Sequence, residues 1–170
     1  MSTLNSYNTG RGVFGNFTGN ITASDTEAFD KALRNTLWEG RMERISTDTY
    51  VDGAHNPRGV ELFLKSVEAF ASKRKNVLLF SVVSDKAYEE MVKIITGGGL
   101  FCEYVVTRPA TKRALAQDDL LRTFAKYTDR PVRAFSNVKD AYEYAKAKEK
   151  DYLFCVGSLY LIGEIKKLKG

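Results

Sequence analysis

Two kinds of hydrophobic segment alternate along this sequence, and the alternation constrains the fold more than any other feature. Asn76–Val83 is an almost unbroken apolar run, which is typical of a strand buried on both faces of a sheet. Residues 57–72 before it and residues 86–96 after it repeat their apolar side chains at helical spacing instead. Strands that alternate with helices in this way predict an α/β domain with a parallel, doubly wound sheet.

The remaining segments extend the same alternation over most of the 170 residues. The further strands expected are Arg44-Ile45, Thr49–Val51, Leu100–Val106, Val132–Phe135 and Tyr152–Val156. The further helices are expected to begin at the capping box of Ser24, at Gln117, at Ser136 and near Ser158. Residues 1–23 are rich in Ser, Thr, Asn and Gly, which predicts a polar arm or linker. We therefore expect one α/β domain over residues 24–170.

The composition excludes several classes of protein. With 44% hydrophobic and 28% charged residues, the chain resembles a globular domain rather than a disordered one. No apolar run approaches the ~18 residues of a membrane-spanning helix, and the polar N-terminus shows no signal-peptide pattern. Cys102 and Cys155 lie in apolar runs, which predicts buried free thiols and a cytoplasmic location. Cysteine and histidine do not cluster, so no metal site is expected.

The net charge of +5 raises the possibility of an anionic partner such as RNA or a nucleotide. A nucleic-acid-binding face would concentrate Lys and Arg among exposed aromatic side chains. Here the lysines are spread, and most aromatic residues occupy expected core positions. A solvated basic surface is the favoured interpretation, with no nucleic-acid partner and no membrane partner.

The segment Tyr50–Gly59, with the sequence YVDGAHNPRG, is the first candidate site. It follows an expected strand, and Asn56-Pro57 is typical of the cap and first position of a helix. Ligands bind at the carboxyl ends of the strands in such sheets, so Asp52 and His55 would lie where a ligand can reach them. The helix N-terminus behind them favours an anion. Alternatively, Asp52 and Asn56 only satisfy backbone donors and His55 has no function.

Two other segments could contact a ligand. Gly157-Ser158, at the start of GSLYLIGE, follows a strand and opens a helix, so it could offer N–H groups and a hydroxyl to a carboxylate or phosphate. The alternative is a simple serine cap. Arg41 could clamp a phosphate or stack on a base, or it could form an ordinary surface ion pair.

Taken together, these motifs resemble those of a known family. Residues 38–43 (WEGRME) look like W-P-G-R-x-E, residues 52–57 spell D-G-A-H-N-P, and residues 157–164 closely match G-S-L-Y-L-V-G-E. Asp85-Lys86 and Arg113–Leu115 also fit. In this order and spacing the motifs resemble the C-terminal domain of folylpolyglutamate synthase and dihydrofolate synthase, of the Mur ligase superfamily, over about residues 33–168. The resemblance implies a Rossmann-like, three-layer domain with a mostly parallel sheet.

The family resemblance implies an ATP-dependent ligase that adds L-glutamate to a folate or pteroate carboxylate through an acyl phosphate, with ATP and Mg²⁺ as cofactors. By position, Arg41 and Asp52 would contact ATP. His55 would be the catalytic residue near the reacting phosphate. His55, Asn56, Ser158 and Tyr160 would bind the glutamate.

Two departures from the family pattern qualify this expectation. Glu39 replaces a proline, and no phosphate loop of the form G-x-x-x-x-G-K-S/T occurs in the sequence. In the family, that loop, the magnesium ligands and most of the folate site belong to a larger central ATPase domain, which we expect to be absent from this chain. The isolated chain would then be inactive without an ATPase domain in cis or in trans. A stand-alone, non-catalytic binding module and the C-terminal domain of another Mur-type amide ligase remain alternatives.

Overall fold

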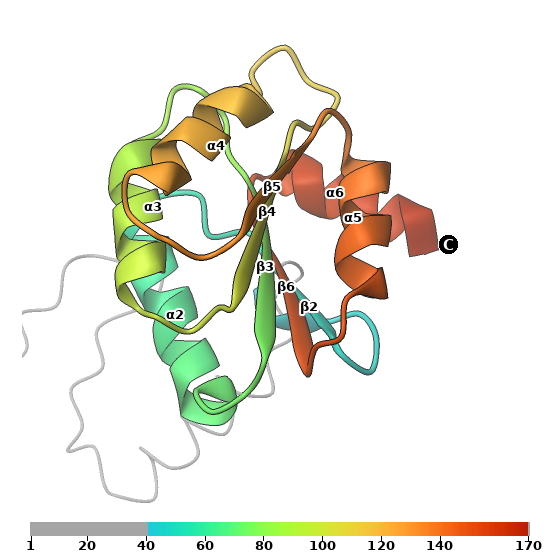
Figure 1. Cartoon of the computed structure of the whole chain (residues 1–170). Helices are drawn as coiled ribbons and strands as arrows, with labels where there is room; N and C mark the ends of the chain where they lie inside the picture. The colour runs from blue at the N-terminus through green and yellow to red at the C-terminus, as the bar shows by residue number, and fades with distance from the viewer. Residues whose placement is uncertain (1–40, 170) are drawn as a thin grey trace, which may run out of the picture. The chain divides into compact units, whose positions relative to one another are not determined.

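A computed structural model describes residues 41–169. Within these residues, six strands form one sheet with the order β1-β2-β6-β3-β4-β5 (Figure 1). The strands are β1 (Glu43–Arg44), β2 (Thr49–Asp52), β3 (Asn76–Ser81), β4 (Glu103–Thr107), β5 (Val132–Phe135) and β6 (Tyr152–Gly157). Only the short edge strand β1 is antiparallel to its neighbour, so the expected mostly parallel sheet is confirmed. The expected polar arm, the helix from Ser24 and the segment 38–40 lie outside the described residues.

Five helices cover the two faces of this sheet (Figure 1). They are α2 (Pro57–Ala71), α3 (Tyr88–Gly97), α4 (Gln117–Ala125), α5 (Val138–Ala147) and α6 (Leu159–Lys169). Helices α2, α3 and α4 lie on one face, and α5 and α6 lie on the other. This arrangement confirms the expected α/β, Rossmann-like three-layer fold.

A hydrophobic core on each face of the sheet explains why the sequence of β3 is an almost unbroken apolar run. All six of its residues are buried. Leu78 and Phe80 pack beneath α2, α3 and α4, whereas Val77 and Leu79 pack beneath α5 and α6. Each such side chain contributes about 1.5–3 kcal/mol by burial, which fixes this strand at the centre of the sheet.

Several expected boundaries differ from the observed ones by one to three residues. Strand β3 ends at Ser81 rather than Val83. Helix α5 is capped by Asn137 rather than Ser136: the Asn137 backbone is extended and its Oδ1 accepts the N–H of Asp140 at 2.9 Å. Strand β4 begins at Glu103 rather than Leu100. Phe101 is apolar because its side chain packs in the core, but its backbone lies before the first residue that pairs with β3. Helix α3 begins at Tyr88 rather than Lys86.

After each parallel strand, the chain turns toward one face of the sheet or the other at the carboxyl edge. The chain leaves β2, β3 and β4 toward α2, α3 and α4 on one face, but it leaves β6 and β5 toward α6 and α5 on the other. The chain therefore leaves two neighbouring strands toward opposite faces of the sheet at three places, β2/β6, β6/β3 and β4/β5. Open α/β sheets bind ligands at such places, where the connections after two neighbouring strands go to opposite faces.

No helix among residues 41–169 combines the length and apolar character that crossing a membrane would require.

Candidate functional site

The pairing of β2 with β6 brings the two main candidate motifs together. Asp52 at the end of β2 is in register with Val156 of β6. The loop that carries His55 therefore starts beside the turn that carries Ser158, although the two are far apart in the sequence. Ser81, at the end of β3, is in register with Gly157 on the other side of β6.

Gly157 makes the turn after β6 possible. Its φ of 121° lies in the region that favours glycine, and a Cβ at this position would come within 1.9 Å of the Ser81 carbonyl oxygen. The next N–H, that of Ser158, donates to the same carbonyl at 2.9 Å. The turn is thus held tightly against β3.

Ser158 is a buried serine at the start of α6. Its Oγ accepts the N–H of Leu161 at 3.2 Å, which is the geometry of a helix cap, and it lies 3.5 Å from the Ser81 hydroxyl. Tyr160, two residues on, is 46% exposed at the same edge. The serine cap foreseen as the alternative is present, and the hydroxyl hydrogen can be donated either to Ser81 or to a ligand.

Asp52 is only 4% exposed, and both of its carboxylate oxygens accept backbone N–H groups. Oδ2 accepts from Met42 at 2.9 Å and Oδ1 accepts from Ala54 at 2.8 Å. Burial raises the pKa of Asp52, while these two N–H groups and the charge of Arg41 oppose the rise. Met42 has a φ of 42°, which is uncommon for a residue with a side chain. Asp52 thus fixes the turn that presents the exposed Arg41.

His55 is half-buried and oriented by its own loop. Its Nδ1 lies 2.7 Å from the Gly53 carbonyl oxygen, and since a carbonyl only accepts, Nδ1 carries the hydrogen. The Nε2 of the neutral ring is then an acceptor. The neighbouring Asn56 uses its Oδ1 to accept the Gly59 N–H at 2.8 Å, which caps α2. The exposed Asn56 thus has the structural role foreseen as the alternative.

A charged group that sequence reasoning left without a role lies at the same edge. Arg113, after β4, forms an ion pair with Asp85, after β3, at 2.7 Å. Tyr160 also interacts with Arg113. Asp85 and, to a smaller extent, Tyr160 raise the pKa of the guanidinium. Asp85 and Arg113 had appeared only as parts of the family pattern. The signal that could have found them is their position in the loops that follow two neighbouring strands.

Among the described residues, no three or more His, Cys, Asp and Glu side chains form a group that could hold a metal ion.

Comparisons with known proteins place this geometry in a family. The model of the Mur ligase glutamate ligase domain matches residues 40–159. The dihydrofolate synthase/folylpolyglutamate synthase of Bacillus subtilis is 28% identical over 156 residues, which cover 87% of this chain and 34% of that protein. The folylpolyglutamate synthase of Lacticaseibacillus casei is 32% identical over 90 residues, covering 51% of this chain and 20% of that protein. The chain thus spans about a third or less of these relatives.

Solved structures agree with the sequence matches. The folylpolyglutamate synthase of Mycobacterium tuberculosis complexed with ADP superimposes with a TM-score of 0.67 at 26% identity, covering 77% of this chain and 32% of that one. The FolC of E. coli, in complex with DHPP and ADP, shares the fold with a TM-score of 0.72 at 16% identity, covering 84% and 34%. The chain therefore belongs to the Mur ligase family, as a glutamate ligase domain of the type found at the C-terminus of folylpolyglutamate and dihydrofolate synthases.

Proposed function

We propose that this domain forms the glutamate- and ATP-contacting half of a ligase that adds L-glutamate to the carboxylate of a folate or pteroate through an acyl phosphate. The observation that carries the proposal is the pairing of β2 with β6, which brings the His55 loop beside the Ser158 turn. The relatives are named as folylpolyglutamate and dihydrofolate synthases, which supports this substrate class.

The incoming glutamate would bind at the start of α6. A helix N-terminus with its N–H groups favours a carboxylate, and the Ser158 hydroxyl can donate a further hydrogen bond. Tyr160 is exposed there and interacts with Arg113, whose positive charge would attract a second carboxylate. Asn56, exposed at the neighbouring loop, would contribute at the rim.

His55 would act on the attacking amine. An amine is nucleophilic toward an acyl phosphate only when it has lost its proton. Since Nδ1 of His55 is bonded to Gly53, Nε2 is the atom that would accept that proton or orient the amine. In its protonated form the ring would stabilise negative charge on the transferring phosphoryl group.

Arg41 and Asp52 would serve the nucleotide in different ways. Arg41 is exposed and would contact ATP directly, as a guanidinium does with phosphate. Asp52 has both oxygens engaged by backbone N–H groups, so its role would be to position Arg41. The ADP in the Mycobacterium tuberculosis structure supports nucleotide binding in this family. Mg²⁺ and the phosphates would be held mainly by an ATPase domain, in cis or in trans.

A chimeric protein tests the proposal. Residues 41–169 replace the corresponding C-terminal domain of the Bacillus subtilis relative, and ATP-dependent incorporation of labelled L-glutamate into dihydropteroate and tetrahydrofolate is measured. We expect incorporation by the chimera and none by the pure 170-residue chain.

The same test contains its controls. His55→Asn in the chimera should abolish incorporation while leaving the fold intact. Separately, titration of the 170-residue chain with L-glutamate should shift the amide resonances of Ser158 and Leu161. A folded chimera without activity, together with no glutamate-dependent shift in the chain, would overturn the proposal.

A further inference from the structure

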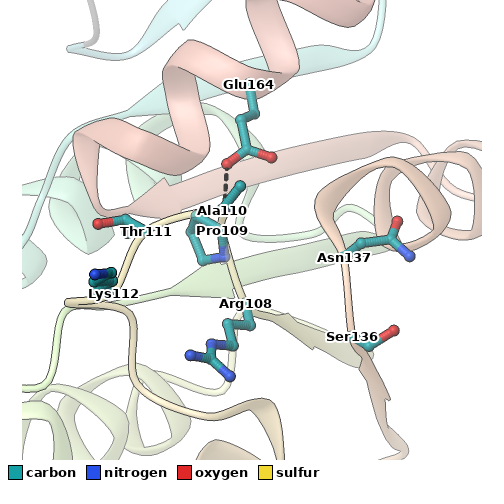
Figure 2. A pocket seen from close by; sticks show the side chains of 8 residues that line it. All are labelled: Arg108, Pro109, Ala110, Thr111, Lys112, Ser136, Asn137 and Glu164. Atoms are coloured by element: carbon teal, nitrogen blue, oxygen red, sulfur yellow. Dashed lines mark hydrogen bonds between the residues drawn. The ribbon is translucent and has the colours of Figure 1, made fainter.

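A crevice opens at the carboxyl edge beyond the ends of β4 and β5, where the chain leaves these two strands toward opposite faces of the sheet. It has a volume of about 450 Å³ and lies between the loop after β4, Arg108–Lys112, and the loop after β5, Ser136-Asn137 (Figure 2). Glu164 of α6 lies on its third side. Three strand spacings, about 14 Å in all, separate the β4/β5 pair from the β2/β6 pair, which carries the His55 loop and the Ser158 turn. None of the residues that line the crevice is among those proposed above to contact glutamate or ATP, although Arg113 directly follows Lys112 in the chain.

The charges that line the crevice favour an anion. Arg108 and Lys112 are exposed, and neither has an ion-pair partner among residues 41–169. The carboxylate of Glu164 accepts the N–H of Ala110 at 2.7 Å, which holds the β4 loop against α6 (Figure 2). Two positive charges against one negative charge leave the crevice with a net positive charge.

A buried hydroxyl without a hydrogen-bond partner lies one residue before Arg108, the first residue of the loop that lines the crevice. Thr107, the last residue of β4, is fully buried, and its Oγ1 has no hydrogen-bond partner in the described part of the chain. It precedes Arg108, and its register partner Phe135 precedes Ser136. Its side chain alternates with that of Val106 and so lies on the α5–α6 face, as Val105 does. Buried hydroxyls are rarely left unsatisfied, so this one indicates a missing polar neighbour.

The N-terminus of α5 completes the crevice. This ten-residue helix begins directly after Asn137, and its dipole directs partial positive charge toward the crevice. Asn137 itself is engaged with Asp140 through both of its side-chain atoms, so it shapes the wall rather than supplying a free donor.

We propose that the β4/β5 crevice binds a small molecule through an oxyanion group, a carboxylate or a phosphate, held by Arg108 and Lys112. The site uses residues other than those assigned to the proposed ligase reaction. At this site, as at the proposed glutamate and ATP site, the chain leaves two neighbouring strands toward opposite faces of the sheet.

Nuclear magnetic resonance titration of the 170-residue chain tests this proposal. The probes are inorganic phosphate and the dipeptide γ-L-glutamyl-L-glutamate, each at constant ionic strength up to about 20 mM, the range of weak binding. We expect saturable shifts of the Ala110, Thr111 and Ser136 amides with at least one probe. The probe that saturates at lower concentration identifies phosphate or carboxylate as the ligand group.

Two variants and a control make the outcome decisive. Arg108→Ala/Lys112→Ala should raise the Kd at least about tenfold, whereas Lys65→Ala, an exposed lysine on α2, should leave it unchanged. Glu164→Gln keeps an acceptor for Ala110 but removes the negative charge, so it should lower the Kd several-fold. Absence of saturable shifts with both probes, or binding unaffected by the double substitution, would overturn the proposal. Neither result bears on glutamate incorporation by the chimera.

Discussion

At the scale of single residues, the site combines side chains that hold the backbone with side chains left to act on a ligand. Asp52 and Asn56 use their oxygens to accept backbone N–H groups, as expected of residues that shape a loop. His55 uses one ring nitrogen in the same way and keeps the other. Ser158 caps a helix through its oxygen, and its hydroxyl hydrogen can be donated to Ser81 or to a ligand. The loop is therefore both a structural turn and a candidate site.

Substitution of His55 should separate these two functions. His55→Ala removes one hydrogen bond from a half-buried loop residue, so the free energy of unfolding should fall by no more than about 1 kcal/mol. Incorporation of glutamate by the chimera should fall at least about a hundredfold, as for a group that transfers a proton. Urea denaturation of the chain and the incorporation assay measure the two effects. A loss of stability well beyond this value, with activity retained, would show that His55 is structural.

Gly157 should be the least replaceable residue of the site. The Cβ of Gly157→Ala would lie 1.9 Å from a backbone oxygen, and its φ of 121° is strained for alanine, so we expect a loss of about 3 kcal/mol or more. Gly163→Ala is the matched control within α6, because nothing lies within 4 Å of its added Cβ. It should stabilise the chain by up to about 1 kcal/mol. Equal effects of the two substitutions on urea denaturation would contradict the close approach of β6 to β3.

At the scale of secondary-structure elements, the start of α5 tests the choice between two adjacent caps. Asn137→Ala removes the acceptor for the Asp140 N–H and should cost about 1 kcal/mol. Ser136→Ala, one residue earlier and exposed, should change stability by less than about 0.5 kcal/mol. Thermal or urea denaturation distinguishes the two substitutions. A larger loss of stability for Ser136→Ala than for Asn137→Ala would show that Ser136 caps α5, as the sequence pattern predicts.

At the scale of the whole molecule, Cys155 should report on unfolding of the entire sheet. It lies in β6 between β2 and β3 and is fully buried, and burial raises the pKa of its thiol. A thiolate-specific reagent should therefore modify Cys155 only when the sheet opens, whereas the partly exposed Cys102 should react earlier.

The measurement follows thiol modification of the chain by mass spectrometry in increasing urea. In Cys102→Ser, modification should appear only across the unfolding transition that circular dichroism records. Fast modification of that variant in the absence of urea would show that β6 is not held at the centre of the sheet.

The sequence by itself determined the types of element, their order and the positions where function was to be sought. The apolar run of β3 indicated burial on both faces, and the capping signals placed α2 closely, because both depend on neighbouring residues along the chain. The motifs around Asp52 and Ser158 indicated the family, and the family model confirmed it.

Only the tertiary structure decided which of these residues meet. Parallel strands pair across long intervals of sequence, and several strand orders would bury the same apolar residues equally well. The insertion of β6 between β2 and β3 joins the His55 loop to the Ser158 turn, and the loops after β3 and β4 join Asp85 to Arg113. The Asp52 contact with Met42, the strict need for glycine at position 157 and the β4/β5 crevice likewise arise from backbone groups that approach one another only in the folded chain.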